Sequence, residues 1–171
     1  MDVMEAIKKR HSTRSYLDKP VEEEKLKKVL EAARLAPSAN NYQEWRYIVV
    51  KDKNTREKLI QAAKGQKFVA EAPIILVACA VTDNHKMTCG QLCYPIDVAI
   101  SLDHLSLAAV EEGLGTCWIG AFYEDEVKKI LAIPPEVHVV ELMTLGYPKA
   151  LSEPMPRKDL KEIVKYEKWT E

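Results

Sequence analysis

The eight residues from 74 to 81, Ile-Ile-Leu-Val-Ala-Cys-Ala-Val, constrain the fold of this chain most strongly. They are apolar without the alternation of polar and apolar residues that marks a strand with one solvated side. Such a run is typical of a central strand that is buried on both faces. Helical and strand patterns interleave on either side of it, so the chain is expected to form a layered α/β or α+β domain.

The remaining elements follow from periodicity and from stop signals. Leu26, Val29, Leu30 and Ala33 have the spacing of a buried helical stripe. The stretch 95–112 is apolar nearly all round, which indicates a helix that fills the core or faces a second subunit. Helices are predicted over 1–10, 20–35, 55–64, 66–72, 95–112, 124–131 and 159–164, and strands over 46–51, 74–81, 116–122 and 137–147, with a proline-rich connection over 148–156.

Length and charge narrow the class of protein. The 171 residues fit one domain, 1–171, and the 25 basic and 26 acidic residues leave the surface nearly neutral. A protein that grips nucleic acid usually carries a basic excess, so nucleic acid is not an expected partner. The sequence shows neither a signal peptide nor the 18 or more apolar residues of a membrane span. Cys79 and Cys117 fall in predicted strands as reduced thiols, which suits the cytoplasm.

Two polar segments carry the chemistry. The first, 36–45, reads Ala-Pro-Ser-Ala-Asn-Asn-Tyr-Gln-Glu-Trp and separates a predicted helix from a predicted strand. Its small, hydroxyl and amide side chains suit either a simple connecting loop or a cradle for a flat ligand rich in heteroatoms. The second, 8–16, gathers Lys, Arg, His, Ser and Thr where a helix ends. It can bind a phosphate or another anion, or it can be a solvated basic turn.

Two other sequence motifs lack the structural context that their usual function requires. Gly113-Leu114-Gly115 follows a helix and precedes a strand, the reverse of a dinucleotide-binding fingerprint. His85, Cys89 and Cys93 would share a helical face, but Gly90 and the lack of a fourth ligand argue against a metal site. No metal is therefore expected, while a redox or disulfide role for Cys89 and Cys93 stays open.

Four pieces in their order along the chain resemble the FMN-dependent nitroreductase family in its short form. They are Arg10-His11-Ser12-Thr13-Arg14, the segment 36–45, Gly113-Leu114-Gly115-Thr116-Cys117-Trp118-Ile119-Gly120, and Met155-Pro156-Arg157-Lys158-Asp159-Leu160. The resemblance implies an α+β fold of three α/β/α layers with a central mixed sheet. It also implies an obligate homodimer with FMN at the interface between the two copies.

The resemblance assigns cofactor-binding residues one by one. Arg10 and Arg157, with Lys158, would hold the FMN phosphate, and Ser12 would support phosphate or ribityl oxygens. Arg14 would lie at the N1/O2 edge of the flavin, and Ile119 and Gly120 near its N5/O4 edge. The other subunit would line the ring with Pro37, Ser38, Ala39 and Asn41. Lys67 matches a ribityl- or ring-contacting lysine, and His11 stands where the family often has Arg.

The implied activity is an NAD(P)H oxidoreductase that reduces nitroaromatic, quinone or other electron-poor acceptors by ping-pong hydride transfer through flavin N5. The flavin carries the chemistry, so no catalytic acid or base is expected, and Arg14 and Gly120 would tune the ring. One alternative stays within the resemblance, a reductive dehalogenase or flavin-fragmenting relative, and a second comes from another class, a flavin-binding protein with little turnover. The sequence does not choose between NADH and NADPH, and residues 83–94 are the one candidate lid.

Overall fold

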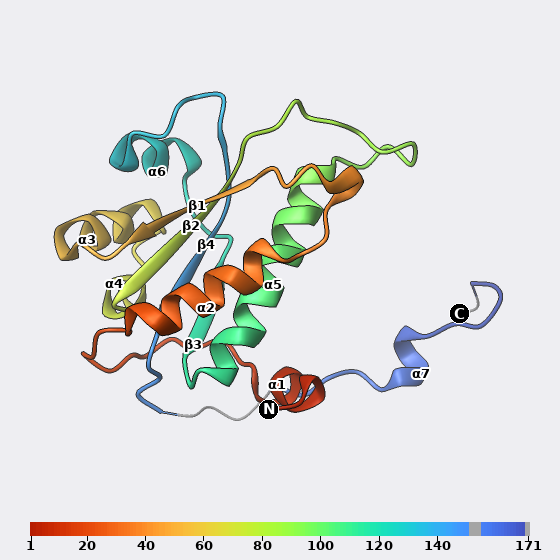
Figure 1. Cartoon of the computed structure of the whole chain (residues 1–171), viewed down its shortest axis with the longest axis horizontal. Helices are drawn as coiled ribbons and strands as arrows, with labels where there is room; N and C mark the ends of the chain where they lie inside the picture. The colour runs from red at the N-terminus through yellow and green to blue at the C-terminus, as the bar shows by residue number, and fades with distance from the viewer. Residues whose placement is uncertain (151–154, 170–171) are drawn as a thin grey trace.

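The computed structural model describes residues 1–150 and 155–169, so four residues of the 148–156 connection lie outside the description. The helices are α1 (Val3–Lys9), α2 (Glu23–Arg34), α3 (Lys53–Ala62), α4 (Phe68–Glu71), α5 (Cys93–Glu111), α6 (Glu124–Leu131) and α7 (Leu160–Ile163). The strands are β1 (Trp45–Val50), β2 (Ile74–Ala80), β3 (Gly115–Ile119) and β4 (His138–Gly146), and a single 3-10 turn covers Ala39–Asn41. Figure 1 shows the sheet at the centre, with α7 extended away from the body.

The sheet has the strand order β1-β2-β4-β3, and its three strand pairings are all antiparallel. All seven residues of β2 are buried, which confirms the central strand predicted from the apolar run. The α+β class is also confirmed. The expectation of a mixed sheet was wrong for the described residues, because the strands pair only in the antiparallel sense. The parallel pairing that the structure does show is an isolated bridge between Ser12 and Thr116.

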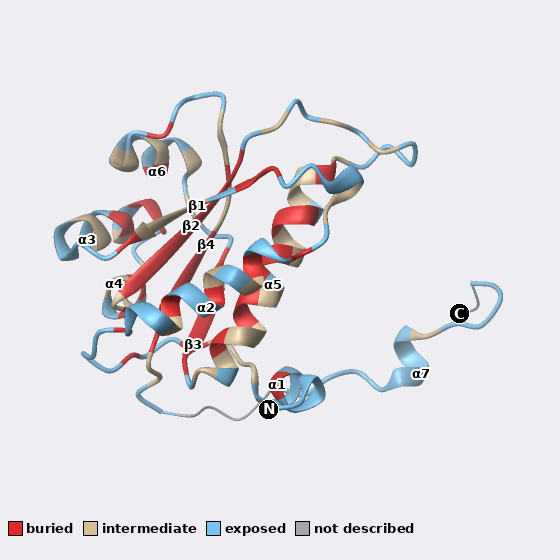
Figure 2. Ribbon diagram, viewed as in Figure 1, coloured by how far each residue is buried: buried red, intermediate tan, exposed pale blue. Residues whose placement is uncertain are grey.

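Helices cover both faces of this sheet, as a doubly buried strand requires (Figure 2). On one face α2 and α5 pack through apolar residues such as Val29 and Leu102 against Leu76 and Met143. On the other face α3, α4 and α6 pack through Leu59, Val69 and Val127 against Val77 and Leu142. The arrangement is therefore three layers, helix on sheet on helix.

Most element boundaries differ from the predicted ones by a few residues, and two of these differences have a local reason. α5 begins at Cys93, so Pro95 falls in the first helical turn, where a missing N–H leaves no intrahelical bond unmade. β3 ends at Ile119 because the chain then turns away from the sheet. The Tyr123 N–H donates to the Ala62 carbonyl at the end of α3, at 2.8 Å, and this bond draws the segment after Gly120 toward α3 and α4.

A β-bulge in β4 redirects side chains near the end of β3. Ala78 pairs with Glu141 and Cys79 pairs with Val139, which leaves Val140 as the extra residue. Bulges change the facing of the residues around them and increase the local twist. Glu141 lies beyond Leu142, the partner of Ile119, so it comes beside Gly120.

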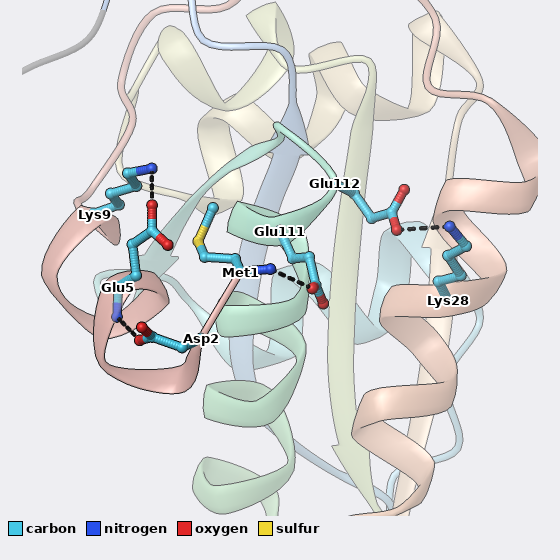
Figure 3. Close-up of polar contacts among 7 residues, drawn as sticks. All are labelled: Met1, Asp2, Glu5, Lys9, Lys28, Glu111 and Glu112. Atoms are coloured by element: carbon cyan, nitrogen blue, oxygen red, sulfur yellow. Dashed lines mark hydrogen bonds and ion pairs between the residues drawn. The ribbon is translucent and has the colours of Figure 1, made fainter.

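Polar contacts fix α1 and α2 at the C-terminal end of α5 (Figure 3). The Met1 amine donates to Glu111 at 3.2 Å, and Lys28 of α2 pairs with Glu112 at 2.8 Å. Asp2 caps α1 by accepting from the Glu5 N–H at 2.8 Å. Exposed ion pairs contribute little stability each, so their main effect is to orient α1, which leads directly into Arg10.

α5 is long and apolar enough to pass a length-and-composition test for a membrane helix, yet 44% of its most apolar window is buried in the chain. Its contacts with the sheet and α2 are those of the core helix of a soluble protein. The predicted apolar face of α1 is exposed in the single chain, since Val3 and Met4 retain 69% and 58% of their accessible surface.

Candidate functional site

The basic segment 8–16 is anchored by its two buried residues, Thr13 and Tyr16. The Thr13 N–H donates to the Thr116 carbonyl of β3 at 2.9 Å, and the Tyr16 hydroxyl donates to the Thr13 carbonyl at 2.8 Å. Thr13 is 3% exposed, whereas Arg14 beside it is exposed. The segment therefore runs along the free edge of β3 with its charged side chains directed outward.

Gly115 makes this close approach possible. A Cβ atom at Gly115 would lie 2.3 Å from Thr13 Oγ1 and 2.9 Å from Thr13 Cβ. Real Cβ atoms do not come this near to another side chain, so any larger residue would displace the segment. Gly115 thus has a packing role, because it allows the segment 10–14 to lie against the strand.

A cavity of about 580 Å³ opens over this segment. Arg10, His11, Ser12, Arg14 and Arg157 all line it, together with Thr13, Ser15, Ala150 and Met155. Arg157 holds its own turn by donating from Nη1 to the Met155 carbonyl at 2.7 Å. Within residues 1–150 and 155–169, no carboxylate forms an ion pair with these three arginines. The cavity is therefore cationic and has the donors that a phosphate monoester needs.

A larger cavity, of about 740 Å³, lies elsewhere, and two of the cations that line it, Lys51 and Arg56, have partners within the chain. Lys51 pairs with Glu23 there, and the Arg56 guanidinium donates to the carbonyls of Ala70 and Ala72 at 2.5 and 2.7 Å. These groups already bind partners within the chain. The smaller cavity over residues 10–14 is the better candidate for an anion.

The segment 36–44 is held in an unusual backbone conformation. Asn40, Asn41 and Gln43 have φ values of 46°, 58° and 50°, in the left-handed region that non-glycine residues rarely adopt. Ser38 Oγ accepts from the Gln43 N–H at 3.0 Å, and Asp97 Oδ2 of α5 accepts from the Ala39 N–H at 3.1 Å. Backbone held in such conformations often marks a binding segment.

The two polar segments lie at opposite ends of α5 (Figure 1). Asp97 holds the segment 36–44 near the start of the helix, while Met1 and Glu111 hold α1 near its end. Fourteen residues of α-helix separate Asp97 from Glu111, a rise of about 21 Å. One chain therefore brings Arg10, His11, Ser12, Arg14 and Arg157 together but keeps Pro37, Ser38, Ala39 and Asn41 apart from them.

The other predicted residues lie at the far end of β3 or outside the cavity. Ile119 is buried and Gly120 is exposed where β3 ends. Lys67 is exposed next to Gln66, whose side-chain amide donates to the Ala121 carbonyl at 3.2 Å, so Lys67 lies beside the turn that follows Gly120. Lys158 is exposed and does not line the cavity of Arg157. Their roles toward a ligand stay predictions.

Charged residues near both ends of β3 influence the pKa of the Cys117 thiol. Burial raises the pKa of Cys117, and the charge of Glu141 adds to this rise. The nearby Arg14, a hydrogen bond with Ser12, and Arg10 act in the opposite direction. The thiol of Cys117, in the middle of β3, is therefore influenced both by the arginines of the cavity and by Glu141.

Sequence reasoning missed two acidic residues that shape this region, Asp97 and Glu141. Asp97 is 4% exposed in the most apolar helix, and Glu141 is half-buried in the run Val-Val-Glu-Leu-Met. A single acid inside an otherwise apolar element is the signal that could have identified both, because ionised groups are costly to bury without a partner.

Comparison with known proteins identifies the family of the chain. The model of the nitroreductase family matches residues 7–88 and 62–147. A NADH dehydrogenase of Thermus thermophilus is 32% identical over 195 residues, covering 96% of this chain and 95% of that protein. An FMN reductase [NAD(P)H] of Bacillus subtilis is 31% identical over 173 residues, covering 91% of this chain and 70% of that protein. A nitroreductase family protein of Clostridium difficile superposes with a TM-score of 0.89 at 34% identity, over 99% of this chain and 100% of the other.

Proposed function

Because the chain belongs to the nitroreductase family and is an oxidoreductase, we propose that it binds FMN and uses NAD(P)H to reduce an electron-poor acceptor such as a nitroaromatic or a quinone. The single observation that carries the proposal is the cavity over residues 10–14, where three arginines and a serine face one space. A relative that is named an FMN reductase [NAD(P)H] supports the choice of cofactor and reductant.

The residues of the cavity fit the phosphate end of FMN. Arg10 and Arg157 present planar guanidinium groups that can each donate two hydrogen bonds to one phosphate, and Lys158 would add charge from the same segment. Ser12 would donate its hydroxyl to phosphate or ribityl oxygens, with His11 as its neighbour. The backbone bond of Thr13 to β3 fixes the backbone of Ser12 and Arg14 in advance, so less ordering of this segment is required on binding.

We propose that the flavin ring of FMN lies along the rest of β3. Arg14 would place its positive charge at the N1/O2 edge, where negative charge develops on reduction. Ile119 and Gly120 would present backbone at the opposite edge, beside Lys67. FMN, when bound, supplies the hydride chemistry between reductant and acceptor. The chain supplies stacking, orientation and exclusion of water, which requires reacting atoms about 3–3.5 Å apart.

We propose that a second copy of the chain completes the site. Pro37, Ser38, Ala39 and Asn41 lie at the other end of α5 from the arginine cavity, so they would reach a shared ring from the partner of a homodimer. The exposed apolar face of α1 and the apolar residues of the C-terminal arm, 155–169, would be covered in such a dimer. The whole chain would act as one FMN-binding domain, 1–171, located in the cytoplasm.

The test is FMN binding followed by turnover. We expect purified protein to bind FMN and its flavin absorbance to bleach with NADH or NADPH and to recover on addition of a nitroaromatic or quinone. Protein that binds no FMN would overturn the proposal. Flavin that binds but is reduced by neither nicotinamide would leave a flavin-binding protein with little turnover.

A substitution locates the site. Arg10→Ala should weaken FMN binding about 10- to 100-fold, because a hydrogen bond to a charged group contributes about 1.5–3 kcal/mol. Arg34→Ala is the matched control, since Arg34 is an exposed arginine on α2 that pairs with Glu31. Fluorescence titration of FMN should show a change in the first variant and none in the second. Equal affinities would place the phosphate elsewhere.

A further inference from the structure

Glu141 has a buried carboxyl oxygen without a partner at the ring end of the proposed site. Among the described residues, two side-chain atoms are buried without a hydrogen-bond partner, Glu44 Oε2 and Glu141 Oε1. Both carboxyl oxygens of Glu141 lie 3.7 Å from the position that a Cβ would occupy on Gly120. Gly120 itself is exposed at the end of β3. The carboxyl is therefore separated from the space over this turn by a residue that has no side chain.

The surroundings of Glu141 make both of its protonation states accessible near neutral pH. Burial raises the pKa of Glu141 to about 7, although a hydrogen bond with the Ile119 backbone opposes the rise. No Lys, Arg or His among residues 1–150 and 155–169 forms an ion pair with it. A neutral carboxyl can donate a hydrogen bond, whereas the ionised form only accepts.

Few titratable groups face Glu141. On β3 the titratable residue is Cys117, but it pairs with Thr144 and lies on the sheet face opposite Glu141. On β2 its partner in the register is Ala78, which has no charge. The titratable residues on the first turns of α5 and at the start of β4 are Cys93, Tyr94, Asp97 and His138, and the rings of Tyr94 and His138 stack at 4.9 Å. None of them supplies a cation that would hold Glu141 in its ionised form.

On the premise that the chain binds FMN as proposed above, we propose that Glu141 faces the bound flavin through the Gly120 turn. Its neutral carboxyl donates a hydrogen bond to an acceptor atom on the ring edge, and its ionisation weakens binding. A flavin edge with carbonyl oxygen and imine nitrogen offers acceptors only, so a carboxylate beside it is repelled. The bulge in β4 is the feature that brings the carboxyl to this position.

The proposal sets the sign of a pH effect. If the neutral form is the one that binds, the apparent affinity falls in proportion to the neutral fraction. With a pKa of about 7, that fraction is high at pH 6 and low at pH 8. We expect FMN affinity to fall about tenfold between these pH values, and binding to be accompanied by proton uptake.

The first measurement uses the protein without FMN. The side-chain carboxyl carbon of Glu141 is followed by NMR in glutamate-labelled protein stripped of flavin, with Glu141→Gln to assign the resonance. We expect a titration midpoint of about 7, as the burial of this group indicates. A midpoint at the ordinary glutamate value of 4.5 would overturn the proposal, because the neutral donor would then be absent at working pH.

The second measurement is FMN affinity from pH 6 to pH 8 by fluorescence titration. Glu141→Gln keeps the size and a donor but cannot ionise, so it should match the wild type at pH 6 and bind about tenfold more tightly than the wild type at pH 8. Glu136→Gln, an exposed glutamate ahead of β4, is the matched control and should follow the wild type throughout. The FMN phosphate also titrates, but it is the same in the titrations of all three proteins.

The outcomes separate the two proposals. Wild-type protein that binds no FMN at any pH overturns the proposed function, and this inference with it. FMN binding with parallel pH curves in the wild type and Glu141→Gln overturns the inference alone. Divergence of Glu141→Gln from the other two proteins above pH 7 supports it.

Discussion

Single residues at the edge of β3 decide whether the basic segment can lie against the sheet, and Gly115 allows a sharp test. Gly115→Ala would place a Cβ 2.3 Å from Thr13 Oγ1, so strand and segment must separate. We expect a loss of about 1–3 kcal/mol in the free energy of unfolding, the usual cost of overpacking. Weaker FMN binding should accompany it, because the same displacement moves Ser12 and Arg14. Urea unfolding with parallel FMN titration measures both effects.

Gly120 supplies the control at the other end of the same strand. A Cβ there would lie 3.7 Å from the nearest atoms, the carboxyl oxygens of Glu141, which is ordinary contact. The free energy of unfolding of Gly120→Ala should therefore lie within about 0.5 kcal/mol of the wild-type value. Similar losses in both variants would show that the close approach of Thr13 is not what makes Gly115 necessary.

At the scale of elements, the segment 36–44 depends on one bond to α5. Asp97→Ala would leave the Ala39 N–H without its acceptor and should cost about 1–3 kcal/mol locally. Because the other hydrogen bonds that the backbone N–H groups of 39–43 donate run within the segment itself, amide hydrogen exchange of 39–43 should accelerate more than that of β2. Asp103→Ala, at an exposed position of the same helix, should leave exchange unchanged. Unchanged hydrogen-exchange protection of residues 39–43 in Asp97→Ala would mean that the segment keeps its conformation without the bond to α5.

Elements were predictable from the sequence where a local pattern determines them. The apolar run of β2, the stripe of α2 and the extent of α6, Glu124–Leu131, are set by periodicity and by neighbouring prolines. The end of β3 was not predictable, because it depends on a hydrogen bond between Tyr123 and Ala62, two residues far apart in the sequence. The clustering of Arg10, Ser12 and Arg14 follows from their proximity in sequence, but Arg157 joins them only through the tertiary fold.

Glu141 illustrates the same limit for the site. Its position beside Gly120 results from pairing between two strands and from a bulge at Val140, and no local pattern encodes that register. Likewise, the separation of the segments 10–14 and 36–44 along α5 becomes visible only once both are packed on that helix. The resemblance to a family supplied the candidate residues, whereas the structure shows which of them one chain brings together.

At the scale of the whole molecule, the C-terminal arm, 155–169, is the feature that a single chain leaves unexplained. It extends from the body in Figure 1 with Leu160, Ile163 and Trp169 exposed to 69%, 63% and 87%. If the arm packs on a second copy, as the proposed homodimer requires, these side chains become buried. Wild-type protein should then sediment as a dimer at micromolar concentration.

The double variant Leu160→Ala/Ile163→Ala tests this directly. Truncating a buried Leu or Ile costs about 2–5 kcal/mol, and a homodimer contains each position twice, so the dissociation constant should rise at least about 100-fold. FMN retention should fall with it, since the residues of the segment 36–44 would leave the ring. Lys161→Ala, an exposed residue of the same helix, should change neither property. Wild-type protein that sediments as a monomer yet retains FMN would exclude a shared site, because each cavity would then be complete within one chain.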